Sequence, residues 1–270
     1  MSAETERPAP AAVNATGVEA YAPAEIAKRI EAVGVAKAKL PFLKLFMLAV
    51  LAGVFIGFGA AFYTVVVTNE GVGYGVARLL GGAAFSLGLV LVVVGGAELF
   101  TGNNLIVMAW ADRRISTAAL LRNWSVSYIG NAVGGVALSV AVYYSGVLEP
   151  EGTAATAVRI AEAKLALSPP EAFLRGALCN ALVCLAVWLS FAARSVTDKI
   201  LAILFPITAF VALGFEHSIA NFYLIPVGLL AGAEGGVMGL AGNIIPVTLG
   251  NIIGGAGGVA GVYWIIYGRG

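Results

Sequence analysis

The sequence holds four ionisable groups within long apolar stretches or at their ends, where charge is costly and usually serves a function. They are Glu98, Glu216, His217 and Glu234. His217 is the single histidine of the chain, and an imidazole can change charge or pass a proton near neutral pH. We expect Glu234, near the end of its stretch, to reach the membrane interface. One such imidazole at the centre of a path suits a small weak acid or its anion.

Two of these groups recur in an internal repeat. The segments G-A-E-L-F-T-G-N (96–103) and G-F-E-H-S-I-A-N (214–221) both fit G-x-E-x-x-x-x-N, at an offset of 214 − 96 = 118. The segments N-W-S-V-S-Y-I-G-N-A-V-G-G (123–135) and N-I-I-P-V-T-L-G-N-I-I-G-G (243–255) share a second pattern, at an offset of 243 − 123 = 120. Two matches in the same order at nearly one offset indicate a duplicated unit.

The repeat pairs the residues that could carry chemistry. Glu98 and Glu216 are equivalent, and they either accept hydrogen bonds from backbone N–H groups exposed by a helix break or transfer protons. Thr101 lies in the first-half break, where its hydroxyl can donate to an anion or position the imidazole. Asn251 and its repeat mate Asn131 add amide groups close to the middle of a span.

The composition excludes most soluble classes of protein. Of 270 residues, 60% are apolar and 11% are charged, whereas a soluble domain carries about 25% charged residues. The net charge of +1 gives no reason to expect a nucleic-acid partner. Cys179 and Cys184 fit no zinc or redox spacing, so we predict neither a metal nor a cofactor. A membrane enzyme would need such a site, and a water or glycerol channel would need paired N-P-A motifs.

Six stretches are long and apolar enough to cross a membrane as helices, at about 41–67, 79–110, 120–147, 172–193, 200–231 and 243–267. Because each half holds three spans, the second half runs through the membrane upside down. The predicted fold is therefore all-α, with six transmembrane helices in an inverted 3+3 repeat. Its second and fifth helices are expected to break at Glu98–Asn103 and Glu216–Asn221, near the centre of the bilayer.

The distribution of lysine and arginine sets the orientation. With the N-terminus in the cytoplasm, twelve fall on the inner side and four on the outer side, which are Arg78, Arg159, Lys164 and Arg175. An even number of spans then leaves both termini in the cytoplasm of a multi-pass protein of the cytoplasmic (inner) membrane. Residues 1–40 form a cytoplasmic segment, disordered over 1–20, with an amphipathic helix at 23–39 that lies on the lipid bilayer. Residues 41–270 form the channel domain.

Four apolar side chains are candidates for constrictions in a pore. Phe85 and Leu89 are i,i+4 neighbours ahead of the first break, and Leu99 and Phe210 flank the two breaks. Each could equally be a core packing residue. A pore for a small solute would need such constrictions to exclude hydrated ions.

The sequence resembles the formate/nitrite transporter family over about residues 40–268. The resemblance lies in the repeat segments at 96–103, 123–131, 214–226 and 243–255, and in C-N-A-L-V-C-L-A-V-W (179–188). The resemblance implies an aquaporin-like fold that assembles as a homopentamer with one pore per protomer. It also implies transport of monovalent anions such as formate, nitrite or hydrosulfide, with protons in some modes. The central histidine, loop threonine and last-span asparagine of the family fall on His217, Thr101 and Asn251.

The resemblance also assigns an outer lysine to Lys164, although composition alone gives it no preference over Arg159. It assigns the slit to Phe85, Leu89, Leu99 and Phe210. Lys164 would attract the anion, and a dry slit would disfavour its charged form. Protonation by His217, directly or through bound water, would let the neutral acid cross. Formate is the expected substrate, and nitrite or hydrosulfide on the same scaffold is the alternative.

Overall fold

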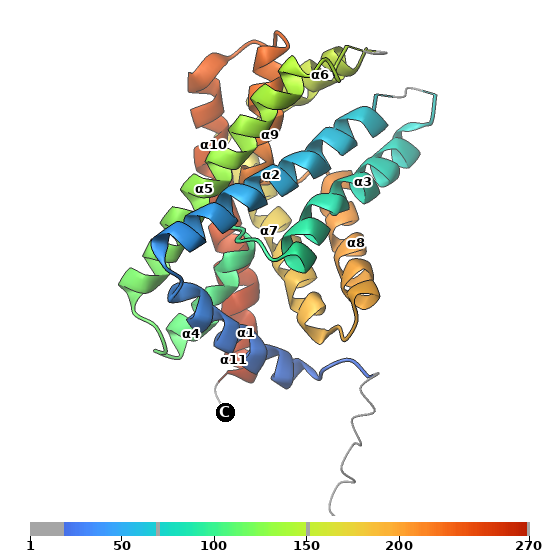
Figure 1. The fold of residues 1–270 in the computed structure, drawn as a ribbon. Helices are drawn as coiled ribbons and strands as arrows, with labels where there is room; N and C mark the ends of the chain where they lie inside the picture. The colour runs from blue at the N-terminus through green and yellow to red at the C-terminus, as the bar shows by residue number, and fades with distance from the viewer. Residues whose placement is uncertain (1–18, 69–70, 150–151, 269–270) are drawn as a thin grey trace, which may run out of the picture.

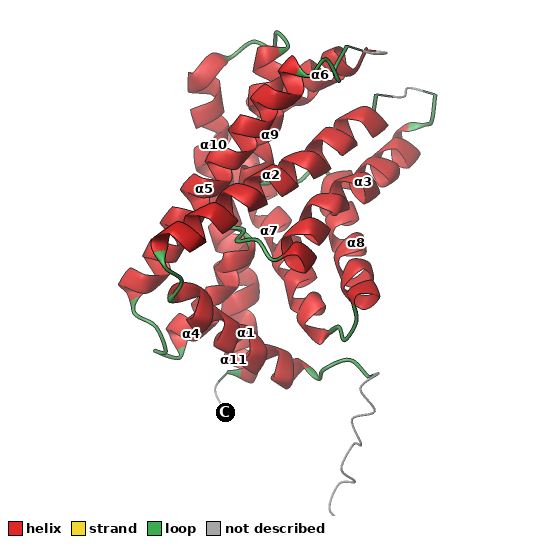
Figure 2. Ribbon diagram, in the orientation of Figure 1, coloured by secondary structure: helices red, strands yellow, loops and turns green. Residues whose placement is uncertain are grey.

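The computed structural model describes residues 19–68, 71–149 and 152–268. In these residues the chain is helical and contains no strand (Figures 1 and 2). The disorder predicted for residues 1–20 lies almost wholly outside the described residues.

Five helices among the described residues are long and apolar enough to cross a membrane. They are α2 (Phe42–Val66), α3 (Tyr74–Gly95), α5 (Thr117–Tyr144), α7 (Pro169–Ala192) and a last helix from Gly236 to Tyr267. The last helix is not uniform. It consists of α10 (Gly236–Ile252), a π-helical stretch η3 (Ile253–Gly261) and α11 (Val262–Tyr267).

Local sequence fixes where two helices start. Before α7, the backbone N–H of Ser168 donates to the Glu171 carboxylate, which closes a capping box beside a proline at the first helical position. Ser195 and Asp198 cap α8 (Val196–Ala212) in the same way, through reciprocal bonds of 3.0 and 3.1 Å. The first residues of α7 and of α8 are therefore specified by polar side chains nearby in the sequence.

The stretch predicted as the second span is interrupted. After α3, Gly96 takes a left-handed conformation (φ 83°), which glycine adopts without a steric penalty and which commonly ends a helix. The chain continues without helical structure to Thr101 and then forms two short elements, η1 (Gly102–Ile106, a 3-10 helix) and α4 (Val107–Ala111).

The stretch predicted as the fifth span is also interrupted, but the gap ends earlier than expected. After α8, Gly214 takes a left-handed conformation (φ 74°), and α9 (Ser218–Leu230) begins directly after His217. Asn221 therefore lies inside α9 rather than in the gap. The reason is that the His217 side chain caps the helix by accepting a hydrogen bond from the backbone N–H of Ala220.

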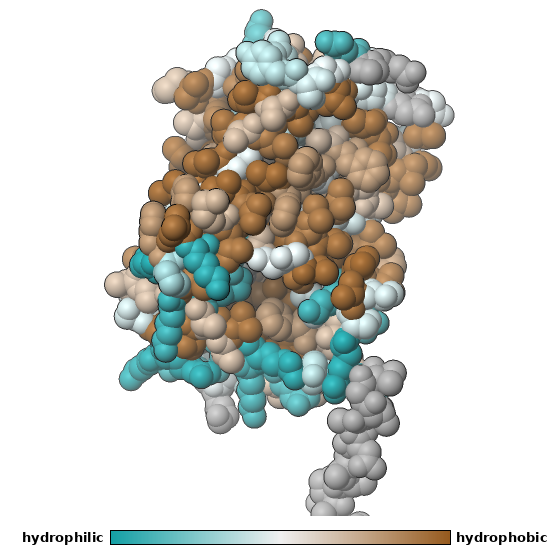
Figure 3. Space-filling model, viewed as in Figure 1, coloured by the Kyte–Doolittle hydropathy of each residue, from teal (hydrophilic) through white to brown (hydrophobic). Residues whose placement is uncertain are grey.

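Two amphipathic helices lie at opposite ends of the molecule, α1 (Pro23–Ala38) at one end and α6 (Thr153–Leu165) at the other (Figure 1). Polar surface gathers at these ends, while a broad apolar band lies between them (Figure 3). Large apolar side chains on the band are exposed, among them Phe62, Ile129 and Leu174. Lipid or another copy of the chain can cover such a band.

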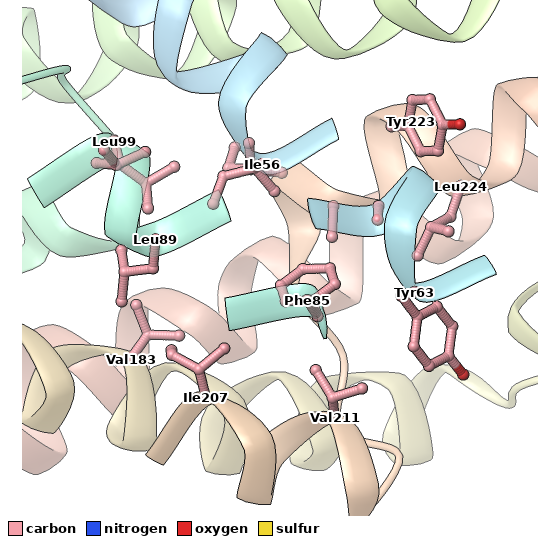
Figure 4. Close-up of a cluster of buried hydrophobic side chains, with 14 of the residues drawn as sticks. Ile56, Tyr63, Phe85, Leu89, Leu99, Val183, Ile207, Val211, Tyr223 and Leu224 are labelled. Atoms are coloured by element: carbon pink, nitrogen blue, oxygen red, sulfur yellow. The ribbon is translucent and has the colours of Figure 1, made fainter. Parts of the chain in front are cut away.

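Close helix contacts surround the apolar core. A Cβ added to Gly53 on α2 would lie 2.1 Å from the carbonyl oxygen of Asn131 on α5, so these two backbones touch. Small residues allow this approach, which stabilises helix pairs in membranes through packing. The core between the helices contains Ile56, Phe85 and Leu89 (Figure 4).

Candidate functional site

A buried threonine–histidine pair joins the two interrupted stretches. The Oγ1 of Thr101 lies 2.9 Å from the Nε2 of His217, and both residues are buried. The Nδ1 of the same ring accepts a hydrogen bond of 3.1 Å from the backbone N–H of Ala220. Because a backbone N–H can only donate, the hydrogen of the neutral imidazole lies on Nε2. The ring therefore donates to Thr101 Oγ1, and the hydroxyl hydrogen of Thr101 is free to point elsewhere.

Asn251 holds the backbone on both sides of His217. Its Nδ2 donates to the carbonyls of Glu216 (2.9 Å) and Gly176 (2.8 Å), and its Oδ1 accepts from the N–H of Ser218 (2.9 Å). Both amide hydrogens are thereby used. Asn251 was predicted to lie on the substrate pathway, and in the structure its side chain clamps the backbone of the break.

Asn131 makes the same three contacts in the first half. Its Nδ2 donates to the carbonyls of Ala49 (2.7 Å) and Glu98 (2.9 Å), and its Oδ1 accepts from the N–H of Phe100 (2.9 Å). Each interrupted stretch is thus fixed by an asparagine on a neighbouring long helix. Irregular backbone can persist inside a membrane protein when its polar groups are satisfied in this way.

A lysine–glutamate pair lies at the end of the molecule where α6 packs. Lys164 Nζ is 2.8 Å from Glu216 Oε1, and Asn221 Nδ2 donates to the other carboxylate oxygen at 2.7 Å. Asn243 accepts from Asn221 (2.7 Å) and donates to the carbonyl of Lys164 (2.9 Å). This pairing distinguishes Lys164 from Arg159, a distinction that composition did not make. We call this group, Lys164, Glu216, Asn221 and Asn243, the outer cluster, after the orientation that the lysine and arginine distribution predicts.

An equivalent cluster lies at the end where α1 packs. Lys37 Nζ is 3.0 Å from Glu98 Oε1 and donates to Asn103 Oδ1 at 2.9 Å. Asn103 Nδ2 donates to Glu98 Oε2 (2.8 Å) and Asn123 Oδ1 (3.0 Å), and Asn123 donates to the carbonyl of Lys37 (3.1 Å). We call Lys37, Glu98, Asn103 and Asn123 the inner cluster.

These clusters revise the roles expected from sequence. The glutamates were expected either to accept from backbone N–H groups or to transfer protons, and the partners seen here are lysine and asparagine side chains. Lys37 and the asparagines Asn123 and Asn243 were missed as site residues. The sequence signal for Lys37 is weak, because Ala36–Lys37 matches Ala163–Lys164 but so does Ala38–Lys39.

Two cavities approach the Thr101–His217 pair from opposite ends. The outer cavity, of about 480 Å³, is lined by His217, Phe85 and Phe210, and the inner cavity, of about 240 Å³, is lined by Leu89 and Leu99. All four candidate constriction residues are thus buried side chains that line one cavity or the other. The rings of Phe85 and Phe210 meet edge to face with centroids 5.5 Å apart, and Phe210 stacks on His217 at 5.9 Å.

The charges around the cavities differ. The outer cavity is lined by one carboxylate, Glu216, and by the cations Arg78, Arg159, Lys164 and Arg175. The inner cavity is lined by one charged pair, Lys37 and Glu98. Among the described residues, no group of three or more His, Cys, Asp or Glu side chains is arranged to hold a metal ion.

Helix α1 covers the inner cavity with Ile30, Gly34 and Lys37. Its Glu31 is buried, with Arg114 Nη1 3.4 Å away. Burial raises the pKa of the Glu31 carboxyl to about 7, and a hydrogen bond with Asp112 and repulsion from that carboxylate act in the same direction. The nearby Arg114 lowers this pKa, but by less than burial and Asp112 raise it, so we expect the docking of α1 to depend on pH.

Long apolar helices around two cavities, each lined by apolar and charged side chains, are typical of a multi-pass membrane channel or transporter. The family model for formate/nitrite transporters matches residues 24–265, and the chain belongs to this family. It is 40% identical to a probable formate transporter of Methanothermobacter thermautotrophicus, over 91% of this chain and 96% of that one. It is 42% identical to the formate channel FocA of Escherichia coli K12, over 91% and 94% of the two chains.

Two solved structures agree in fold. A pentameric formate channel with formate bound superposes with a TM-score of 0.77 at 42% identity, over 84% of this chain and 98% of that one. An FNT family ion channel superposes with a TM-score of 0.83 at 28% identity, over 90% and 98% of the two chains.

Proposed function

We propose that this protein passes formate across the cytoplasmic membrane, as a channel or a proton-linked transporter, without converting it chemically. The observation that carries the proposal is the Thr101–His217 pair, which lies between two cavities that each hold a lysine–glutamate cluster. The relatives named for formate support the choice of substrate.

We infer a topology of six spans in an inverted repeat, with both termini in the cytoplasm of an inner membrane. In this arrangement α3 with α4, and α8 with α9, form the two broken spans. The matching contacts of Asn131 and Asn251 support the repeat. Residues 1–40 are then a cytoplasmic segment, and 41–270 are the channel domain.

We infer a homopentamer with one path in each protomer. The exposed apolar side chains on the long helices support an assembly that buries part of this band against neighbouring copies. The pentameric formate channel that superposes on this chain gives the number of copies.

The first step of transport is attraction of the anion to the outer cavity. Four cations and one carboxylate line it, so its potential favours a monovalent anion. Lys164 is paired with Glu216, so its ammonium group stays at a fixed position in the cavity wall. Arg78, Arg159 and Arg175 extend this field toward the solvent.

The second step is passage between the cavities, past the rings of Phe85 and Phe210. This dry slit favours the neutral acid over the anion, because an unpaired charge is costly away from water. The hydroxyl hydrogen of Thr101, left free by the contact with Nε2, can donate to an oxygen of formate. Leu89 and Leu99 line the far cavity, into which the acid would emerge and lose its proton.

The source of the proton follows from the tautomer of His217. To give up its Nε2 hydrogen and remain neutral, the ring would need a proton on Nδ1, and that atom accepts from Ala220. Protonating Nδ1 would break the cap of α9. We infer that His217 stays neutral and that the anion takes up a proton from the external solution, delivered through water in the outer cavity.

The test is stopped-flow uptake into proteoliposomes that contain a pH dye, with formate and nitrite compared at two external pH values. The proposal predicts faster entry of formate, accompanied by a change of lumenal pH when the external pH is low. Equal or faster entry of nitrite would transfer the assignment to nitrite. Entry of neither anion, in vesicles shown to hold assembled protein, would contradict the proposal.

A further inference from the structure

Asn180 on α7 is a fully buried amide that contacts the backbones of Thr101, one partner of the central pair, and of Asn251, which clamps the other partner. Its Nδ2 donates to the carbonyl of Asn251 at 2.7 Å and to the carbonyl of Thr101 at 3.3 Å. Both amide hydrogens are thereby used. Thr101 contacts the ring of His217, and Asn251 holds the backbone on both sides of it. The Asn180 side chain therefore links the loop that carries Thr101 to the asparagine that holds the backbone around His217.

The first half of the chain has no counterpart of this amide. The carbonyl acceptors of the two clamps, Ala49 and Gly176, are related by 176 − 49 = 127, and the same offset aligns Gly53 with Asn180. At Gly53 the helix backbone itself touches the carbonyl of Asn131. In the first half, close packing of the helix backbones at Gly53 takes the place that the Asn180 amide has in the second half.

The second half differs because its last helix changes from α-helical to π-helical hydrogen bonding just after Asn251. The helix is α-helical to Ile252 and π-helical from Ile253 to Gly261, whereas α5 is α-helical throughout. A change from i→i+4 to i→i+5 bonding alters the partners of carbonyls at the junction, and π-helical segments are frequent at functional sites. Asn180 supplies a donor to the carbonyl just before this junction.

Gly255 provides the space for the amide. A Cβ added there would lie 2.2 Å from Asn180 Nδ2, so a larger residue would displace it. Two further donors lie near the Thr101 carbonyl: the backbone N–H of Asn104 at 3.4 Å and the thiol of Cys184, a weak donor, with Sγ at 3.4 Å. The amide makes the shortest of these three contacts, and it alone links Thr101 to Asn251.

We propose that Asn180 is a positioning residue of the transport path, which fixes the Thr101–His217 contact by joining the backbones of Thr101 and Asn251. The inference rests on the proposed function in one respect, that this contact lies on the path of the anion. Without the amide, two buried carbonyls lose a donor, and the loop that carries Thr101 can move away from the ring.

The direct test uses the single histidine of the chain. Protein labelled with ¹⁵N-histidine, and purified without a polyhistidine tag, reports His217 alone in its NMR spectrum. The proposal predicts that in Asn180→Ala the Nε2 proton of His217 moves upfield and exchanges faster with water than in the parent protein. Gly255→Ala, which displaces the same amide from the opposite helix, should cause the same change.

Cys179→Ala is the matched control, because it truncates a buried side chain next to Asn180 on α7. It should leave the His217 signal unchanged. Formate uptake should fall about tenfold in Asn180→Ala, as expected when buried carbonyls lose a donor, and remain near the parent rate in Cys179→Ala. If Asn180→Ala does not assemble, Asn180→Asp keeps the volume but removes the donors, and it is expected to change the signal in the same way.

An unchanged His217 signal in assembled Asn180→Ala would overturn the proposal, whether or not uptake falls, because the effect would then be structural only. The ring signal does not depend on which anion is carried. A parent protein that fails to transport formate but shows the predicted signal changes would therefore contradict the proposed function and not the contact.

Discussion

The outer and inner clusters share one chemistry but differ in their surroundings. Each joins a lysine, a glutamate and two asparagines. Most contacts match, but Lys37 also donates to Asn103 Oδ1, whereas Asn221 Oδ1 has no hydrogen-bond partner among the described residues. The side chain of Lys164 is 13% exposed and that of Lys37 is 27% exposed, and the outer cavity is about twice as large. Further cations line only the outer cavity, and the inner one is covered by α1.

Features found at both ends of the molecule belong to the transport path itself, and features found at one end belong to that side of the membrane. Because the lysine–glutamate pair occurs at both ends, we attribute it to the path. The additional arginines at the outer end act at longer range on an anion in solution. Helix α1 at the inner end carries the buried Glu31, and we expect its docking to depend on the pH at that end.

The largest expected effect separates the two glutamates. Glu216→Ala leaves Lys164 buried without a partner and should lower the free energy of unfolding by about 3 kcal/mol. Glu98→Ala should cost less, because Lys37 is more exposed and can reach water. Denaturant unfolding of the solubilised protein, with the exposed Glu234→Ala as control, measures both. Equal losses would mean that the two clusters do not differ in burial as described.

The next effect separates the two lysines in transport. Lys164→Ala should slow formate uptake from the outside by about tenfold at low ionic strength, whereas Lys37→Ala should chiefly slow exit from the inside. Proteoliposomes of defined orientation distinguish the two directions. Lys164→Arg keeps the charge and should retain most of the rate. An unchanged salt dependence in Lys164→Ala would show that this lysine does not attract the anion.

Much of this arrangement could be predicted from sequence, because hydropathy and repeated motifs are local signals. The spans, the two interruptions and the central residues His217 and Thr101 follow from them. Lys37 could not be distinguished by composition, since it lies among the other charges of an amphipathic helix. The tautomer of His217 was also beyond prediction, because it depends on where α9 begins, which the ring itself determines.

Helix α1 provides a pH-dependent difference between the two ends. Since the pKa of Glu31 rises from 4.5 to about 7 in the folded protein, its contribution to docking is complete below the unfolded value and is lost as pH rises through about 7. We expect hydrogen exchange of α1 amides to quicken progressively between about pH 4.5 and about pH 7 and to level off above that, after correction for the intrinsic rate. Glu31→Gln should flatten this dependence, and α6 at the outer end should not show it. A parent protein with pH-independent protection of α1 would exclude Glu31 as the cause.

The smallest expected effect concerns the exposed outer arginines. Arg159→Ala should reduce uptake by about twofold at low salt and have no effect at high salt, because the field of an exposed charge is screened. Arg122→Ala on the inner side is the matched control and should leave uptake from outside unchanged. A loss in Arg159→Ala that persists at high salt would indicate a direct contact with the anion instead.

The most direct test of the account is the state of the His217 ring, measured by ¹⁵N NMR in lipid nanodiscs with formate present. The cap on Nδ1 predicts a neutral ring with one protonated and one bare nitrogen, and with the hydrogen on Nε2, from about pH 5 to about pH 8. Conversion of both nitrogens to the protonated form within that range would contradict the account. The proton carried with formate would then come from the histidine itself.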